Sequence, residues 1–277
     1  MATWFITGCS TGLGRALAEA VLARGHNAVV TARDTAKLAE LSEAYPDTAL
    51  ALPLDVTDPD QVVEAAQQAQ SRFDGIDVLV NNAGYGYCAA VEEGEAADIQ
   101  RLFATNFFGA VGTIEALLPN MRVRRTGAIV NISSIGARFS PVGFGYYSAT
   151  KAALEGMSGS LRKELQPLGI SVTVVEPGSF RTDFSDRSLV QPAKAIADYS
   201  ETAGKRRKEI DSTHGTQPGD PAKAAQAIIA AVEDPNPPFM LLLGKDALGR
   251  YFEVEEAQRA DVEKWRELTI GTDFDAP

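Results

Sequence analysis

A tyrosine and a lysine stand four positions apart in residues 145–151, which read GYYSATK. Four residues make about one helical turn, so a helix here would place Tyr147 and Lys151 on one face and Tyr146 elsewhere. A free phenol has a pKa of ~10, and a nearby ammonium group favours the phenolate and so lowers this pKa by about 1–3. The spacing therefore makes Tyr147 and Lys151 a candidate proton-transfer pair, with Tyr147 as general acid and base. Taken alone, such a pair is also typical of plain packing beside an extended lysine stem.

A glycine-rich turn follows the first apolar run and reads TGCSTGLG over residues 7–14. Taken alone, it could be an ordinary turn, and no Gly-Lys-Ser/Thr follows to make a nucleoside-triphosphate loop. Its place between a strand and a helix instead favours a dinucleotide, because glycines allow close approach and helix amides attract phosphate. The predicted cradle consists of Gly8, Ser10, Thr11, Gly12, Leu13 and Gly14.

The end of the second apolar run indicates which dinucleotide binds. An NAD site tends to place a carboxylate there, but the sequence VVTARD places Ala32 at that point and Arg33 after it. An arginine can bind a 2′-phosphate through several N–H donors. We therefore predict NADP(H) rather than NAD(H). NAD remains the alternative, because Asp34 could reach a ribose, although a helix N-cap is the role we expect for it.

Short apolar runs alternate with helix-like segments along most of the chain. The runs are near-continuously apolar, which is typical of a parallel sheet covered on both faces. We predict one doubly wound α/β domain, a Rossmann fold, over residues 1–277, with about seven strands. The expected strands cover 3–7, 27–32, 49–56, 76–84, 127–134, 170–178 and 238–244, and the expected helices 14–25, 34–44, 58–73, 95–121, 145–168 and 220–234.

Composition excludes several classes of function. The 277 residues carry a net charge of −11, which would repel a nucleic-acid backbone. No apolar stretch approaches the ~18 residues that cross a bilayer, and no signal peptide is evident, so we expect a cytoplasmic protein with no membrane partner. Cys9 and Cys88 are expected to be reduced thiols, and Cys9 lacks a histidine to activate it. With only His26 and His214 besides, we expect no metal site.

The chain resembles the short-chain dehydrogenase/reductases. The resemblance rests on an ordered set of motifs over the first two-thirds of the sequence: TGCSTGLG at 7–14, LDVTD at 54–58, NNAG at 81–84, Asn106, NISS at 131–134, YSATK at 147–151 and PGSFRT at 177–182. A more limited similarity, PPFMLLLGKDA at 237–247, is to members that resemble steroid or retinol dehydrogenases and bacterial oxidoreductases.

This resemblance implies roles for particular residues. Leu13 would offer its amide to the pyrophosphate, and Lys151 would bind the nicotinamide ribose. The remaining implied cofactor contacts are Asp55 and Val56 at the adenine, Asn82, Ala83 and Gly84 at the adenosine ribose, and Pro177, Gly178, Phe180 and Thr182 at the nicotinamide amide.

Four residues match the catalytic tetrad of that family: Asn106, Ser134, Tyr147 and Lys151. Ser134 would hydrogen-bond the substrate oxygen and steady the charge that develops there. By resemblance, Asn106 would hold a water that links Lys151 to solvent. The tetrad implies an oxidoreductase acting on a ketone, an aldehyde or a secondary alcohol.

Substrate and assembly are less fully specified. We expect residues 183–219, an irregular polar stretch, to form a lid over a medium-sized hydrophobic substrate. Three alternatives stay open: an NAD-dependent alcohol or steroid dehydrogenase, a dinucleotide-binding regulator without chemistry, and an enzyme of this fold that dehydrates or epimerises. The helices at 95–121 and 145–168 carry surplus apolar residues, so we expect a homodimer or homotetramer. The expected pocket wall is Phe139, Val142, Phe144, Phe184 and Leu189.

Overall fold

Seven of the apolar runs form one parallel sheet in the computed structural model, which describes residues 1–185, 188–213 and 215–274. The strand order is β3-β2-β1-β4-β6-β7-β9, and every neighbouring pair is parallel. The order runs outward in both directions from β1, so the predicted doubly wound sheet is confirmed. The strands are β1 (Thr3–Ile6), β2 (Asn27–Ala32), β3 (Ala49–Pro53), β4 (Val78–Asn81), β6 (Gly127–Ile132), β7 (Ile170–Pro177) and β9 (Met240–Leu243).

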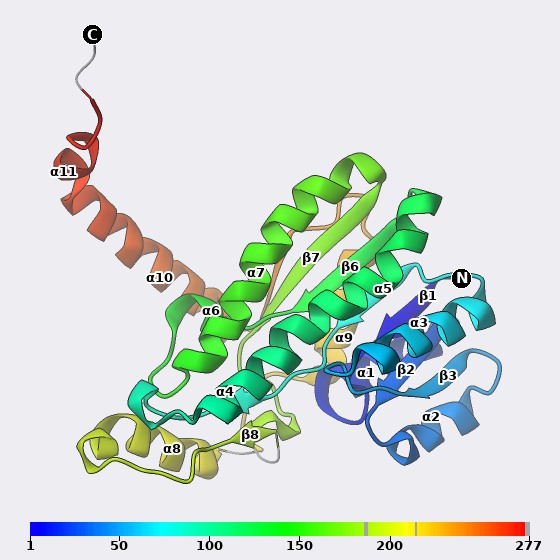
Figure 1. Cartoon of the computed structure of the whole chain (residues 1–277), viewed down its shortest axis with the longest axis horizontal. Helices are drawn as coiled ribbons and strands as arrows, with labels where there is room; N and C mark the ends of the chain where they lie inside the picture. Colours follow the sequence, from blue (N-terminus) through cyan, green and yellow to red (C-terminus); the bar gives the residue numbers. More distant parts are fainter. Residues whose placement is uncertain (186–187, 214, 275–277) are drawn as a thin grey trace.

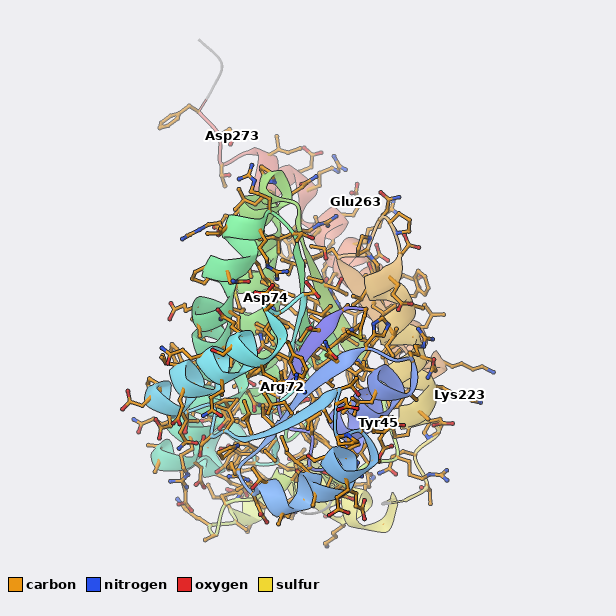
Figure 2. All side chains as sticks on the ribbon, turned by 90° about the vertical axis from the view of Figure 1, so that its right-hand side faces the viewer. Tyr45, Arg72, Asp74, Lys223, Glu263 and Asp273 are labelled. Atoms are coloured by element: carbon orange, nitrogen blue, oxygen red, sulfur yellow. The ribbon has the colours of Figure 1, made fainter. Side chains whose placement is uncertain are left out.

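Helices cover both faces of the sheet (Figure 1). Alternate residues of each strand point to opposite faces, so Trp4 and Ile6 join one core and Phe5 joins the other. Figure 2, a view turned by 90°, shows α3 with Arg72 and α9 with Lys223 on opposite sides of the sheet. The first core is covered by α1 (Gly12–Ala23), α2 (Ala39–Ala44) and α9 (Pro221–Glu233), and the second by α3 (Pro59–Phe73), α5 (Gly109–Arg124) and α7 (Gly145–Leu165).

The helix predicted over 95–121 is not one regular helix. It consists of α4 (Ala96–Phe103), the π-helical segment η3 (Ala104–Phe108) and α5. A π segment adds a residue to the turn and is frequent at functional sites, and this one carries Asn106. By length and composition the whole stretch Ala96–Arg124 could cross a membrane, contrary to our expectation. That is weak evidence for a span, because core helices pass the same test and this stretch packs on α3 and α7.

The segment 183–219 is more regular than predicted. It contains η5 (Asp183–Ser185), β8 (Leu189–Val190), η6 (Ala197–Tyr199), the π-helical η7 (Ser200–Gly204) and α8 (Lys205–Thr213). Strand β8 pairs in parallel with β5 (Gly86–Tyr87), outside the main sheet. The expected helix over 34–44 likewise begins as 3-10 turn η1 (Thr35–Leu38) before α2.

The chain ends in a helix that the sequence did not predict. Helix α10 (Lys245–Lys264) leads into α11 (Arg266–Ile270), and together they extend away from the sheet (Figure 1). Only the first turns pack on the body, where Ala247 is fully buried and Tyr251 stacks on Arg138, and the residues after Val254 are exposed.

Candidate active site

A cavity of about 760 Å³ opens at the carboxyl ends of the strands. In an open α/β sheet this edge is where ligands bind. The cavity gathers residues that follow six different strands, which explains why the sequence motifs are so far apart. Of the predicted site residues, its wall includes Gly8, Ser10, Thr11, Gly12, Leu13, Arg33, Asp55, Val56, Asn82, Ala83, Gly84, Ser134, Tyr147, Lys151, Pro177, Gly178, Phe180 and Thr182. Gly14 and Asn106 lie outside this wall and support it from behind, as described below.

The glycine loop leaves the first turn of α1 open to an anion. Thr11, the N-cap residue of α1, makes no side-chain capping hydrogen bond, whereas Asp58 caps α3 and Asp220 caps α9. Gly8 and Gly12 have φ values of +72° and +63°, which favour glycine. The helix amides therefore remain available for the pyrophosphate of a dinucleotide, and the residues present fit such a group.

Gly14 shapes the cradle from behind. A Cβ atom there would collide with Asn82 Nδ2 and lie 2.5 Å from the carbonyl oxygen of Gly8. The Asn82 amide donates to the carbonyls of Thr7 (2.8 Å) and Gly8 (3.0 Å). Asn82 therefore ties the end of β4 to the glycine loop in addition to lining the cavity.

Cys9 lies within the same loop and is fully buried. Its thiol donates to the carbonyl of Ile6 (3.2 Å), and burial raises its pKa to about 12. A thiol held in this way is a poor nucleophile at neutral pH, in agreement with the expectation from the sequence.

The end of β2 presents Arg33 at the cavity wall, and its side chain is exposed. Among the described residues no hydrogen bond or ion pair engages its guanidinium. Asp34 accepts from the amide of Ala36 (3.1 Å), so its predicted role as an N-cap is confirmed. Asp55 accepts from the amide of Thr57 (2.9 Å), which fixes the turn after β3.

Helix α7 places Tyr147 and Lys151 in the cavity wall and directs Tyr146 away from it. The exposed fractions of Tyr147 and Lys151 are 7% and 5%. Lys151 Nζ donates to the carbonyl of Ile132 (2.8 Å) and lies 5.8 Å from the centroid of the Tyr147 ring. The hydroxyl of Tyr146 instead donates to the carbonyl of Val91 (2.7 Å).

Burial dominates the proton affinities of this pair. It raises the pKa of Tyr147 to about 12, opposed by a hydrogen bond from Ser134, and lowers the pKa of Lys151 to about 8. The expected lowering of the Tyr147 pKa by Lys151 is therefore wrong for the described protein groups alone. The reason is geometric, because the ammonium group is directed to the end of β6 rather than to the phenol oxygen.

Asn106 lies behind the wall of the cavity, in η3, and is buried. Its side chain accepts from the amide of Tyr85 (3.0 Å) and donates to the carbonyl of Tyr85 (2.9 Å) and to Thr150 Oγ1 (3.2 Å). A Cβ atom on Gly84 would lie 3.1 Å from Asn106 Oδ1 and 3.4 Å from Lys151 Nζ. Gly84 therefore keeps open a small space between Asn106 and Lys151.

The loop after β7 is held by a residue that sequence reasoning missed. Asp246, in the first turn of α10, accepts from the amide of Ser179 (2.7 Å). A Cβ atom on Gly178 would collide with the Asp246 carboxylate. Phe180 bridges to Gly219, so the predicted nicotinamide loop is fixed from two sides.

The far end of the cavity is mainly aromatic and aliphatic. Phe139, Phe144 and Phe184 line it as predicted, together with Pro141, Val190, Ile210 and the cation Arg206. Val142 is 58% exposed and lies outside the wall, which corrects that prediction. Leu189 is also absent from the wall, although it packs beside Phe184 in the same small cluster.

A buried ion pair attaches the segment 183–219 to the body. Glu93 is 1% exposed and binds Arg207 of α8 through both carboxylate oxygens, at 2.7 and 3.2 Å. Glu93 also accepts from the amide of Ile196 (2.9 Å), and these contacts lower its pKa to about 2. Described residues of the segment, among them Phe184, Val190 and Ile210, line the cavity, and its movement as a lid stays a prediction.

Comparison with known proteins agrees with this geometry. A family model described as short chain dehydrogenase matches residues 2–192. A 3-ketodihydrosphingosine reductase of Bacteroides thetaiotaomicron is 36% identical over 242 residues, which cover 86% of each chain. A solved short-chain dehydrogenase from Streptomyces avermitilis is 42% identical, with a TM-score of 0.92, and the match covers 99% of this chain and 100% of that one.

A further solved short-chain dehydrogenase, from Burkholderia cenocepacia, is in complex with NADP. It is 26% identical, with a TM-score of 0.74, and the match covers 95% of this chain and 96% of that one. The glycine loop and the tyrosine–lysine pair lie within residues 2–192, which the family model matches. The solved structures match almost the whole chain, including its seven-stranded sheet. This chain therefore belongs to the short-chain dehydrogenase family of oxidoreductases.

Proposed function

We propose that this enzyme transfers a hydride between NADP(H) and a hydrophobic ketone, aldehyde or secondary alcohol, with Tyr147 as general acid and base. One observation carries the proposal. The buried phenol of Tyr147 and the hydroxyl of Ser134 face the same cavity whose other end is the uncapped N-terminus of α1. A single cavity thus offers an anion site for the dinucleotide and a proton donor for the substrate. Reduction of a carbonyl by a nicotinamide dinucleotide requires both.

The chain's own residues would supply the proton and the orientation. The dinucleotide, when bound, supplies or accepts the hydride. Tyr147 would protonate the carbonyl oxygen in reduction, and Ser134 would hold that oxygen by a hydrogen bond. Lys151 would hold the ribose hydroxyls, and Asn106 would hold a water in the space beside Gly84.

Arg33 supports the preference for NADP(H). Its guanidinium is exposed at the cavity wall, and Asp34 is engaged as an N-cap rather than turned to a ribose. The complex of the Burkholderia cenocepacia relative with NADP agrees with this choice.

Replacing Arg33 by aspartate tests the preference. A hydrogen bond to a charged group contributes about 1.5–3 kcal/mol, so the KM for NADPH should rise by about 10- to 100-fold. The KM for NADH should change little, because NADH has no 2′-phosphate. Arg122→Asp, an exposed site in the last turn of α5 with the same charge change, serves as the control. Equal effects of Arg33→Asp on both cofactors would contradict the proposed contact.

The substrate class follows from the aromatic end of the cavity. Phe139, Phe144 and Phe184 offer apolar walls beside Tyr147, and the relative from Bacteroides thetaiotaomicron is named 3-ketodihydrosphingosine reductase. We expect NADPH consumption across a panel of ketones to increase with alkyl chain length. Product analysis on the same panel would identify a dehydration or an epimerisation, and binding of the dinucleotide without turnover of any panel member would favour the regulator.

We also propose that the outer faces of α5 and α7 pair two copies of the chain. Phe108, the last residue of η3 before α5, is 62% exposed, and the exposed residues of α7 include the small Ala149 and Ala152. Cβ atoms on Gly112 and Gly156 would meet nothing within 4 Å, so two such helices could approach closely. Sedimentation at micromolar concentration should show a dimer or tetramer, and a monomer alone would reject the pairing.

A further inference from the structure

One face of α7 meets the end of β6 at successive turns. Tyr147, Lys151, Glu155 and Ser158 follow one another at spacings of four, four and three residues. Lys151 donates to the carbonyl of Ile132, Ser133 Oγ donates to Glu155 (2.6 Å), and Asn131 Nδ2 donates to Ser158 (2.8 Å). Glu155 therefore occupies the turn directly after Lys151, on the same buried face.

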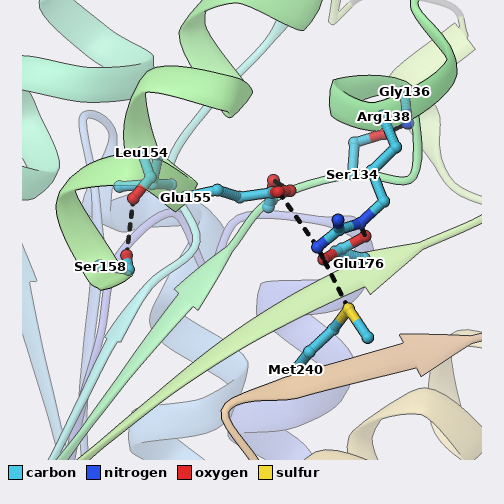
Figure 3. A network of polar contacts seen from close by, with 9 residues as sticks. Ser134, Gly136, Arg138, Leu154, Glu155, Ser158, Glu176 and Met240 are labelled. Atoms are coloured by element: carbon cyan, nitrogen blue, oxygen red, sulfur yellow. Dashed lines mark hydrogen bonds and ion pairs between the residues drawn. The ribbon is translucent and has the colours of Figure 1, made fainter. Parts of the chain in front are cut away.

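A charged network surrounds Glu155 (Figure 3). Arg138 of the short helix α6 (Gly136–Phe139) lies 3.4 Å from Glu155 but binds Glu176 more closely, with two contacts of 2.5 Å. Glu176 is 0% exposed, and Arg138 is the cation that pairs with this buried carboxylate. Figure 3 shows Arg138 between the two carboxylates, with Met240 beyond it.

The other groups that face this carboxylate are few among the described residues. Ser133 comes from the end of β6, Arg138 from α6, Glu176 from β7 and Lys151 from α7 itself. From α10, the Tyr251 ring stacks on Arg138 at 5.4 Å and does not contact Glu155. Two cations therefore act on Glu155, first Arg138, which it shares with Glu176, and then Lys151 from its own helix.

Glu155 also affects the charge of Lys151. Lys151 is 5% exposed, and the one hydrogen-bond partner of its ammonium group in the described part of the chain is neutral, the carbonyl of Ile132. Burial lowers the pKa of Lys151, and the negative charge of Glu155 opposes that shift. Burial likewise raises the pKa of Glu155 to about 7, so its charge is present mainly above neutral pH.

We propose that Glu155 is a positioning residue that keeps Lys151 protonated and so sets the pH range over which Tyr147 exchanges its proton. The second part rests on the proposed function, which gives Lys151 its role beside the nicotinamide. The first part concerns the protein alone and can be tested without turnover.

Glu155→Gln removes the charge and keeps an oxygen that accepts from Ser133. A carboxylate stabilises the protonated form of Lys151. Loss of the carboxylate therefore lowers the Lys151 pKa and moves the basic limb of the pH–rate profile to lower pH. We expect a shift of about one pH unit, and therefore a rate about tenfold lower on that limb. Below about pH 6, where Glu155 itself is protonated, the two profiles should coincide.

Two variants control for general damage. Glu164→Gln removes the same charge from an exposed position on α7 and should leave the profile unchanged. Glu155→Asp keeps the charge, so the basic limb of its pH–rate profile should lie close to that of the parent. A uniform loss in Glu155→Gln at every pH, with no displaced limb, would mean that Glu155 is only structural and would overturn the proposal.

A readout without turnover separates the two parts. Lysine side chains labelled with ¹³C at Cε can be titrated by NMR, and the Lys151 signal identified by its loss in Lys151→Arg. We expect the Lys151 pKa to fall in Glu155→Gln, and an unchanged value would overturn the proposal. A lowered Lys151 pKa with an unmoved rate profile would retain the effect of Glu155 on Lys151 but reject the proposed part of Lys151 in the reaction.

Discussion

Tyr147→Phe is expected to lower kcat by about 10³-fold while the dinucleotide still binds. The substitution removes only the hydroxyl that would carry the proton. The ring packs against Phe144 and Phe184, with centroids 6.0 and 5.4 Å away, and a phenylalanine keeps both contacts. The melting temperature and the dinucleotide Kd, measured by fluorescence titration, should therefore stay close to those of the parent.

The adjacent tyrosine provides a matched control for this change. Tyr146→Phe removes a hydroxyl of the same kind, one that donates to the carbonyl of Val91 outside the cavity. We expect a loss of about 1 kcal/mol in the free energy of unfolding and full turnover. If the two variants lost activity equally, the proton could not be assigned to Tyr147.

Gly14→Ala is expected to weaken dinucleotide binding strongly. A Cβ atom at this position would collide with Asn82 Nδ2 and crowd the Gly8 carbonyl, which is backbone and cannot rotate away. The Asn82 bridge to Thr7 and Gly8 must then break, and overpacking of this kind costs about 1–3 kcal/mol in stability. The dinucleotide Kd should rise by about 100-fold or more, because the glycine loop and the Asn82 side chain that holds it would both move.

Gly249→Ala gives the comparison for this second variant. Gly249 lies in α10, and a Cβ atom there would meet nothing within 4 Å. Alanine in an exposed helix should raise the free energy of unfolding by about 1 kcal/mol and leave binding unchanged. Tight dinucleotide binding by Gly14→Ala, measured by the same titration, would show that the cradle does not depend on this close approach.

The sequence predicts the sheet and the cavity wall well because local patterns determine them. Strands of a parallel sheet are buried on both faces and read as apolar runs, and parallel strands bring their carboxyl ends to one edge. Residues such as Gly8, Asp55 and Gly178 follow strands of this kind, so they converge on the cavity. The phosphate cradle and the tyrosine–lysine face thus follow from local spacing.

Features that depend on distant contacts escaped prediction. Asp246 supports Ser179 across 67 positions of sequence, and no local pattern announces that contact. The π segment around Asn106 has the same apolar composition as the helices on either side of it. Helix α10 has few buried residues, so it lacks the apolar stripe that predicts packing against a core.

The proton affinity of Tyr147 could not be predicted from spacing for a related reason. Helical spacing places Lys151 on the correct face, but the side chain extends to Ile132 and leaves burial to dominate the phenol. The spacing of Glu155, four residues after Lys151, was a readable signal of the same type. It becomes informative only when Arg138 is seen to be engaged by Glu176.

The phenol of Tyr147, with a pKa of about 12 in the protein, is expected to become a proton acceptor when a cationic nicotinamide lies beside it. Tyrosinate absorbance measures this directly. At about pH 9, below the pKa of ~10 of an ordinary phenol, a lowering of about 3 units by oxidised dinucleotide should produce about half an equivalent of tyrosinate in the parent and none in Tyr147→Phe, and reduced dinucleotide should produce none in either. Equal absorbance changes in both proteins, with oxidised dinucleotide bound to each, would contradict this role of Tyr147.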